Sequence, residues 1–323
     1  MPVTPAPATA PAGARYLRSR RDTAAVVAAV ILGLVVLWAF RFRGWYPHDE
    51  GTLGQSAERI LRGEIPHRDF DDPYTGGLGL LHALVFRLGG ISMNALRSHL
   101  ALVATIWFGG VFWLLTRWLR PVGAAVVAAL IAVLSVPLYP AAMPSWYVLF
   151  LACAAGALLT VSPHRRAGTL FLAGALIGLA ALAKITAVFA LAGAAWALVA
   201  MRQAEDRQRR GRIEVVLAAA AFTLLVVRLV SARFDGRVFF HLALPSMAVV
   251  AGIAWREIRQ GRARGFGIDV TLWQRVAALA AGAAVPMLAY ALWLARHDAL
   301  APLVASLHAV VARRSASASL PPP

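Results

Sequence analysis

Seven of the fifteen acidic residues of this chain are gathered in one short stretch near its N-terminal end. They are Asp49, Glu50, Glu58, Glu64, Asp69, Asp71 and Asp72. A carboxylate can take a proton from a substrate hydroxyl, so any chemistry is expected here first. Carboxylates beside a bilayer are costly to desolvate and usually face a water-filled cavity or a partner. We therefore expect these acids to border a polar site.

The rest of the chain has the composition of a membrane protein. Of its 323 residues, 60% are hydrophobic and the mean hydropathy is +0.67, whereas a soluble domain has roughly 45–50% apolar residues. Long Ala, Leu and Val runs alternate with short Arg-bearing stretches, the pattern of a polytopic membrane protein. The net charge of +17 suggests nucleic acid at first sight. Because the arginines lie between apolar runs, where they set orientation, we expect no nucleic-acid partner.

The apolar runs predict an all-α fold with about nine transmembrane helices. The first, 23–40, follows four arginines and lacks a cleavage site after it, so we interpret it as a retained span and not a signal peptide. Residues 1–22 are expected to be a disordered cytoplasmic tail. The later candidate spans are 98–116, 121–139, 146–161, 168–183, 185–200, 213–231, 238–254 and 276–294.

One apolar segment, Gly76–Gly90, decides the topology. If it stays on the outer side, as an interfacial or re-entrant helix, fourteen arginines of the later connections face the cytoplasm; if it crosses, all fourteen face outward. They are Arg117, Arg120, Arg165, Arg166, Arg202, Arg207, Arg209, Arg210, Arg212, Arg256, Arg259, Arg262, Arg264 and Arg275. The positive-inside rule favours the first arrangement. The acidic segment 41–97 then forms one large outer loop, in which two acidic turns bracket a short helix at Thr52–Arg62.

This pattern resembles the GT-C class of membrane glycosyltransferases, in particular the polyprenyl-phosphate mannosyltransferases (including protein O-mannosyltransferases) and lipid A aminoarabinose transferases. The acidic pair Asp49-Glu50 soon after the first span carries the resemblance, together with His67-Arg68-Asp69-Phe70 and the later element 178–184, which ends at Lys184. The similarity covers roughly residues 20–200. It implies a transmembrane glycosyltransferase domain over 23–296.

The resemblance implies inverting transfer of a sugar from a polyprenyl-phosphate donor to a glycan, lipid or protein acceptor on the outer side. Asp49 is the expected base. Glu50 is expected to orient the acceptor or to share a divalent cation with Asp49, since some members of the class use a metal. Lys184, the only lysine of the chain, is the expected phosphate ligand. Further substrate-binding candidates are Asp69, Asp72, Arg233 and Arg237.

The chain departs from the class in its second outer loop, where residues 139–147 carry no acid. Asp69 or Asp72 replaces that acid, or the activity is different or lost. Two other functions stay open: a transporter or flippase of a polar or lipid-linked substrate, and a non-catalytic envelope scaffold. Residues 297–323 are expected to be an outer tail or the start of a truncated region. Abundant Ala and Arg with almost no Lys indicate a bacterial plasma membrane protein.

Overall fold

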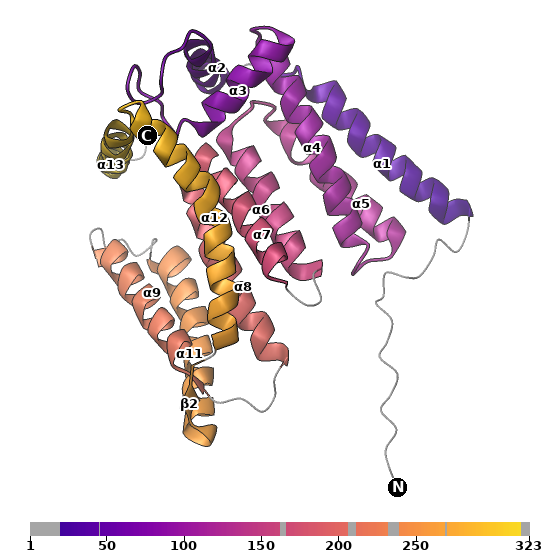
Figure 1. Cartoon of the computed structure of the whole chain (residues 1–323). Helices are drawn as coiled ribbons and strands as arrows, with labels where there is room; N and C mark the ends of the chain where they lie inside the picture. Colours follow the sequence, from indigo (N-terminus) through magenta and orange to yellow (C-terminus); the bar gives the residue numbers. More distant parts are fainter. Residues whose placement is uncertain are drawn as a thin grey trace. The chain divides into compact units, whose positions relative to one another are not determined.

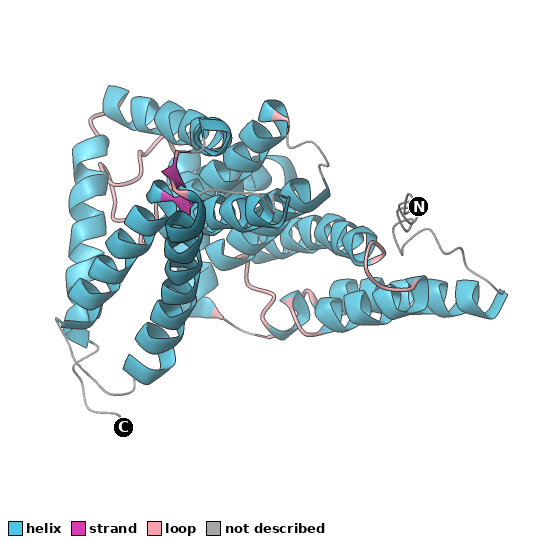
Figure 2. Ribbon diagram, turned by 90° about the horizontal axis from the view of Figure 1, so that it is seen from below, coloured by secondary structure: helices cyan, strands magenta, loops and turns pink. Residues whose placement is uncertain are grey.

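The computed structural model describes residues 20–44, 46–161, 166–205, 211–231, 239–268 and 270–317. These residues form twelve α-helices and two strands of two residues each, β1 (Gly211–Arg212) and β2 (Phe266–Gly267), which pair in parallel. Figure 2 shows helices joined by short loops almost throughout. The all-helical class predicted from the sequence is confirmed.

The chain divides into two compact units, and the boundary falls inside two helices, α8 and α12. Unit 1 comprises residues 1–191 and 279–323, and unit 2 comprises residues 192–278. The first part of unit 1 contains α1 (Arg20–Phe40), α2 (Pro47–Leu61), α3 (Gly77–Gly89), α4 (Met93–Leu115), α5 (Pro121–Val133) and the 3-10 turn η2 (Val136–Leu138). Its remaining elements are α6 (Pro144–Val161), α7 (Ala167–Ala183), the 3-10 turn η3 (Ile185–Ala187) and α13 (Leu300–Ser317). The helices that cross the boundary are α8 (Val188–Glu205) and α12 (Val270–Arg296), and unit 2 also holds α9 (Ile213–Ser231), the π turn η4 (Phe239–Ala243) and α11 (Leu244–Arg264).

Four helical segments of the described residues are long and apolar enough to span a bilayer. They are Asp22–Phe40, Met93–Leu115, Pro121–Leu138 and Val270–Arg296. Four of the nine predicted spans therefore have the length and composition of membrane helices. The other five coincide with α6, α7, α8, α9 and α11. The described apolar stretches of the first four have fewer than 18 residues, and α11 carries several charged residues. The sequence did not predict α13, which occupies most of the expected tail.

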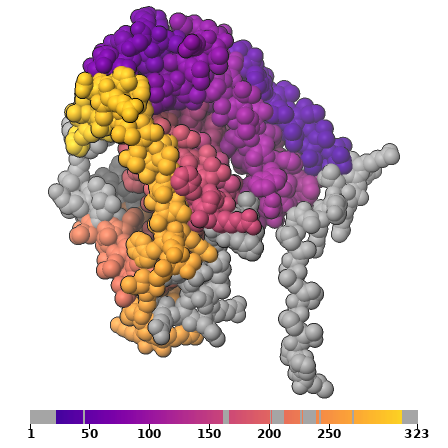
Figure 3. Space-filling model, in the orientation of Figure 1, coloured from indigo at the N-terminus to yellow at the C-terminus, as the bar shows by residue number. Residues whose placement is uncertain are grey.

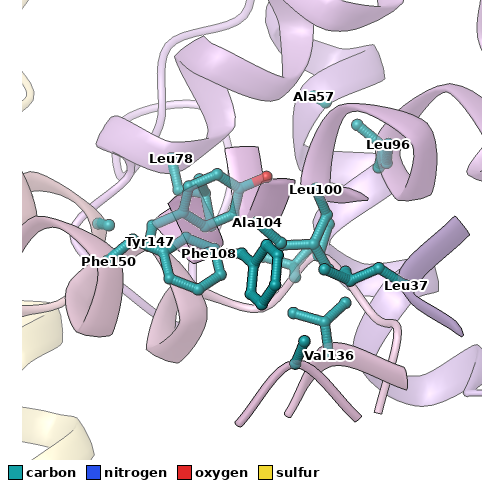
Figure 4. Packing of buried hydrophobic residues seen from close by; sticks show 14 of the residues in the cluster. Leu37, Ala57, Leu78, Leu96, Leu100, Ala104, Phe108, Val136, Tyr147 and Phe150 are labelled. Atoms are coloured by element: carbon teal, nitrogen blue, oxygen red, sulfur yellow. The ribbon is translucent and has the colours of Figure 1, made fainter. Parts of the chain in front are cut away.

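The core of unit 1 is formed where α1, α4, α5 and α6 meet the two short helices of the acidic segment. In Figure 1, α1 lies beside α5, α6 beside α7, and α2 beside α3. Leu37, Leu100, Phe108 and Val136 are almost fully buried and point toward one another in Figure 4. Leu78 and Phe86 of α3 belong to the same cluster. Burial of this apolar surface holds the acidic segment against the helix bundle.

The chain enters α4 at the same end of unit 1 at which it leaves α1. Arg97, in the second turn of α4, donates hydrogen bonds to the carbonyls of Arg43 (3.3 Å) and Gly44 (3.1 Å), which directly follow α1. Residues 41–92 therefore begin and end at one end of unit 1, and α3 does not carry the chain to the other end. In the space-filling view, α2 and α3 form a continuous surface at the top of unit 1 (Figure 3).

A hydrogen-bonded chain of three side chains ties α3, α4 and α6 together below this surface. The Tyr147 hydroxyl lies 3.3 Å from His82 Nε2 and 3.1 Å from His99 Nδ1. His82 is fully buried. Buried polar groups are costly unless they are hydrogen-bonded. These hydrogen bonds therefore favour one placement of α3, α4 and α6 relative to one another.

Glycines bring α7 and α12 into close contact within unit 1. A Cβ atom on Gly174 would lie 1.9 Å from the carbonyl oxygen of Leu279, and one on Gly282 would lie 1.9 Å from the carbonyl oxygen of Phe171. Gly178, one turn beyond Gly174, would place a Cβ 2.3 Å from the carbonyl oxygen of Ala283. The crossing therefore requires residues without side chains, as in tightly packed membrane helices.

In unit 2, α9 packs along α11, and buried charges accompany the short strand pair. Glu257 of α11 is 1% exposed and accepts a hydrogen bond from the backbone N–H of Arg212 in β1 at 2.9 Å. Gly261 lies directly under the ring of Phe266 in β2. These contacts close the end of unit 2 at which the strands pair.

Replacing Gly174 with Ala should destabilise the protein, because the new methyl group meets the backbone of α12. Such overpacking typically costs about 1–3 kcal/mol. We expect a lower melting temperature of the purified protein in detergent. Gly156→Ala in α6 is the matched control, since no atom lies within 4 Å of its Cβ position. Equal melting temperatures for the two variants would contradict the close crossing.

Candidate functional site

A buried ion pair fixes the first turn of α2, which carries the acidic pair. Glu50 and Arg97 are each 5% exposed. Arg97 Nε donates to Glu50 Oε1 at 2.7 Å, and Arg97 Nη2 donates to Glu50 Oε2. This two-pronged geometry is the strongest form of a carboxylate–guanidinium contact. With the Arg43 and Gly44 carbonyls, it joins the end of α1, the start of α2 and the start of α4 at one point.

Asp49 precedes Glu50 in α2 but is partly exposed and contacts a different part of the chain. The Tyr139 hydroxyl donates a hydrogen bond to Asp49 Oδ2. Tyr139 follows η2 and packs against the ring of Tyr46, with the ring centres 4.4 Å apart. Partial burial, together with the hydrogen bond to Asp49, raises the pKa of Tyr139 to about 12. The phenol therefore stays protonated and donates at physiological pH.

Lys184 lies at the C-terminal end of α7, at the same end of unit 1. Its backbone is extended, so α7 stops there, and its Nζ donates to Ser145 Oγ at 3.1 Å. Ser145 is in the first turn of α6, beside the end of α7. Lys184 is partly exposed, and Ser145 carries no charge, so the hydrogen bond between them leaves the positive charge of the ammonium unbalanced. No acid among the described residues pairs with it, so this cation can bind an anionic ligand.

Asp49 and Lys184 are thus attached to two ends of one short connection. Tyr139 contacts Asp49, and Ser145, six residues later, contacts Lys184. Six residues span at most about 20 Å when fully extended. The connection is folded, because Trp146 Nε1 donates to the carbonyl of Tyr139 at 3.0 Å. The expected base and the expected phosphate ligand therefore contact the same folded connection.

Two further predicted substrate-binding acids, Asp69 and Asp72, lie in contrasting environments. Asp69 is exposed, pairs with Arg68 at 2.9 Å and accepts a hydrogen bond from the Ile65 N–H at 2.7 Å. The Arg68 contact and the Ile65 bond lower the pKa of Asp69 to about 2. Asp72 is 4% exposed and accepts from the Tyr74 N–H at 2.8 Å. Both acids are thus engaged within the acidic segment itself. The other two candidates, Arg233 and Arg237, lie outside the described residues.

Asp72 belongs to a buried polar cluster with His67. His67 is 7% exposed and has a φ of 67°, in the left-handed region that non-glycine residues rarely adopt. Neither ring nitrogen makes a hydrogen bond of good geometry, although the Thr75 backbone lies close enough to favour the protonated ring. Burial lowers the pKa of His67 and raises the pKa of Asp72. Gly76 packs tightly against this cluster, because a Cβ there would lie 2.6 Å from the Tyr290 hydroxyl and 3.4 Å from His67 Nε2.

The acidic pair is poorly suited to hold a divalent cation. Arg97 occupies both oxygens of Glu50, and Tyr139 occupies one oxygen of Asp49. A cation site in a protein normally draws on several free oxygen ligands. Across the described ranges, no three His, Cys, Asp or Glu side chains are grouped so that they could hold a metal. We therefore derive no step through a metal at Asp49 and Glu50.

Sequence reasoning did not assign roles to two residues that the structure brings to the site. Arg97 ends the acidic segment and directly precedes the predicted span 98–116, and a charge beside an apolar run is itself a signal for an acidic partner. Tyr139 carried no signal, because an aromatic residue at the end of a span is usually an interfacial anchor. The comparisons with known proteins do not add to this picture: the chain matches no protein-family model, no curated protein and no solved structure.

Replacing Arg97 with Gln should strongly destabilise the protein, because Glu50 is left buried without a charged partner. Breaking one side of a buried pair costs about 3–5 kcal/mol. The matched control is Arg62→Gln, because Arg62 pairs with Glu58 and its side chain is 63% exposed. An exposed pair contributes about 1 kcal/mol or less. Chemical or thermal unfolding in detergent measures both variants, and similar losses in the two would refute the central role of the buried pair.

Asp72→Asn should stabilise the protein at neutral pH. Burial raises the pKa of Asp72 in the folded state, so native stability falls as the pH rises from the unfolded pKa of about 3.9 toward the folded value. Asn cannot ionise and still accepts the Tyr74 N–H. The melting temperature of the variant should exceed that of the native chain at pH 7, and the difference should vanish near pH 4.

Asp69→Asn is the control for this pH dependence, because it should change the melting temperature at pH 7 in the opposite direction from Asp72→Asn. Because the folded pKa of Asp69 is lowered to about 2, its carboxylate stabilises the native chain above the unfolded pKa, and that stability is lost as the pH falls through the folded value. The variant should melt below the native chain at pH 7. Shifts of the same sign for the two variants would contradict the assignment of the two environments.

Proposed function

We propose that this chain is an integral membrane glycosyltransferase that moves a sugar from a polyprenyl-phosphate donor to an acceptor hydroxyl, with inversion at the anomeric carbon. Asp49 is the base, and Lys184 binds the donor phosphate. The acceptor, a glycan, lipid or protein, is met on the extracytoplasmic side. The proposal places the protein in a bacterial plasma membrane with its N-terminus in the cytoplasm and nine spans.

The observation that carries the proposal is the shared attachment of Asp49 and Lys184 to the connection between η2 and α6. A base and an anion-binding cation within one region are what transfer from a phosphate ester requires. The two residues lie far apart in the sequence, in α2 and at the end of α7. Support comes from their contacts with Tyr139 and Ser145, which belong to the same short connection at one end of unit 1.

In this mechanism the acceptor oxygen forms a bond to the anomeric carbon while the bond from that carbon to the phosphate oxygen breaks. Asp49 accepts the proton of the acceptor hydroxyl through Oδ1, since Oδ2 already accepts from Tyr139. The bonding electrons of the broken bond remain on the polyprenyl phosphate. Attack from the face opposite the leaving group gives inversion.

Lys184 stabilises the leaving group. Its ammonium is a point charge at the end of an apolar helix, where the phosphate of a lipid in the outer leaflet would arrive. The neighbouring surface of α7 supports binding of a lipid chain. Leu182 and Ile185, on either side of Lys184, line an apolar cavity of about 140 Å³ together with residues of α12 and α13.

Glu50 serves in this scheme as a positioning residue and not as a second base. Its carboxylate is fully engaged by Arg97, so it neither takes a proton from a substrate nor reaches an acceptor. The pair instead holds the first turn of α2, and with it Asp49, against α4. The orientation of this end toward the outside rests on the distribution of the arginines in the connections of the chain.

The test is transfer by the purified full chain in nanodiscs, supplied with a panel of polyprenyl-phosphate hexoses and pentoses. Release of polyprenyl phosphate and formation of the glycosylated product are measured together. Asp49→Asn should lose at least about 100-fold in turnover, because an amide cannot accept the proton. Asp71→Asn is the matched control, since Asp71 is an exposed acid of the same segment.

The alternatives predict different results. Equal turnover in the native chain and Asp49→Asn would remove Asp49 from the mechanism. If no donor is turned over while a lipid-linked sugar is moved across the bilayer of a vesicle, the chain is a flippase. If neither is seen, the scaffold function is favoured.

A further inference from the structure

Asp49 needs a defined orientation if it is to act as a base. A carboxylate at the end of an aspartate side chain rotates easily, because its terminal torsion is broad. Asp49 lies in the first turn of α2 and is partly exposed, so packing alone does not fix its two oxygens. The contact that distinguishes them is the hydrogen bond from the Tyr139 hydroxyl to Oδ2.

Tyr139 is itself held at three points, which makes its hydroxyl a fixed donor. Its backbone N–H donates to the Val136 carbonyl at 3.0 Å, and its own carbonyl accepts from Trp146 Nε1 at 3.0 Å. Its ring packs on Tyr46, the residue that directly precedes α2. A donor whose own position is fixed by neighbouring contacts is what a preorganised site requires.

We infer that Tyr139 is a positioning residue for Asp49. Its hydroxyl donates to Oδ2 of Asp49, so that Oδ1 alone faces the acceptor hydroxyl. The inference rests on the proposed function. Burial and the hydrogen bond to Asp49 raise the pKa of the phenol to about 12, so the hydroxyl stays protonated and donates to Oδ2. It acts by fixing the orientation of the Asp49 carboxylate.

The inference predicts a loss of turnover without a loss of binding. Removing the hydroxyl in Tyr139→Phe keeps the ring against Tyr46 but frees the carboxylate to rotate. Misplacement of a reacting group by about 1 Å can cost 100-fold in rate. We expect kcat to fall about 10–100-fold while KM for the polyprenyl-phosphate sugar changes less than about threefold.

The matched control removes a phenol elsewhere in the acidic segment. Tyr74→Phe changes a residue whose ring packs against the core of unit 1, and its kcat should stay within about threefold of the native value. The double variant Asp49→Asn/Tyr139→Phe completes the design. If Tyr139 acts through Asp49, adding Tyr139→Phe to Asp49→Asn should change the residual rate by less than about threefold. A full multiplicative loss in the double variant, or a kcat of Tyr139→Phe equal to the native value, would overturn the inference.

A second readout keeps the inference distinct from the proposed function. The rate at which a water-soluble carbodiimide and an amine modify Asp49 is measured by peptide mass spectrometry, without any substrate. Loss of the phenol should raise this rate severalfold in Tyr139→Phe and leave it unchanged in Tyr74→Phe. If the native chain transfers no sugar, the proposed function fails, and this labelling alone tests the contact. Equal labelling of Asp49 in the native chain and Tyr139→Phe would show that the phenol does not hold the carboxylate.

Discussion

The buried pair between Glu50 and Arg97 is the constraint on which the arrangement of unit 1 depends. Two charges at 5% exposure are stable only when each satisfies the other, so α2 cannot move away from α4 without leaving a charge unpaired. The same guanidinium binds the carbonyls that follow α1. The end of α1, the start of α2 and the start of α4 are therefore joined at one point. This contact holds the acidic segment at the end of the helix bundle at which α1 ends.

The residues of the candidate site are linked to this ion pair through a series of contacts. Helix α2 carries Asp49 beside Glu50, Tyr139 joins Asp49 to the end of η2, and the connection that follows reaches Ser145 and Lys184. At the other side of the segment, Arg68 donates to the His297 carbonyl at 3.2 Å and so ties the acidic loop to the end of α12. Each contact is a hydrogen bond between charged or polar groups; the bond from Tyr139 to Asp49 is partly buried, and the other two are exposed.

Sequence patterns were sufficient for the all-helical class of fold, but not for the contacts of single residues. The apolar runs predicted most helices because burial and membrane contact both follow hydrophobicity. Adjacent acids could not be told apart: Glu50 pairs across 47 residues and Asp49 across 90. The phase of α2 turns one inward and the other toward Tyr139. Asp72 is buried although Asp71, one residue before it, is exposed, and His67 has a left-handed backbone; no local sequence pattern predicted either feature.

The central claim is that the end of unit 1 carrying Asp49 and Lys184 faces the extracytoplasmic side. Its most direct test uses single cysteines in a Cys153→Ala background and a membrane-impermeant maleimide applied to sealed right-side-out vesicles. Gln55→Cys probes an exposed position of α2, and Trp118→Cys probes an exposed position beyond the opposite end of α4. The account predicts labelling of Gln55→Cys in sealed vesicles and of Trp118→Cys only after permeabilisation. The reverse pattern, or labelling of both from one side, would contradict it.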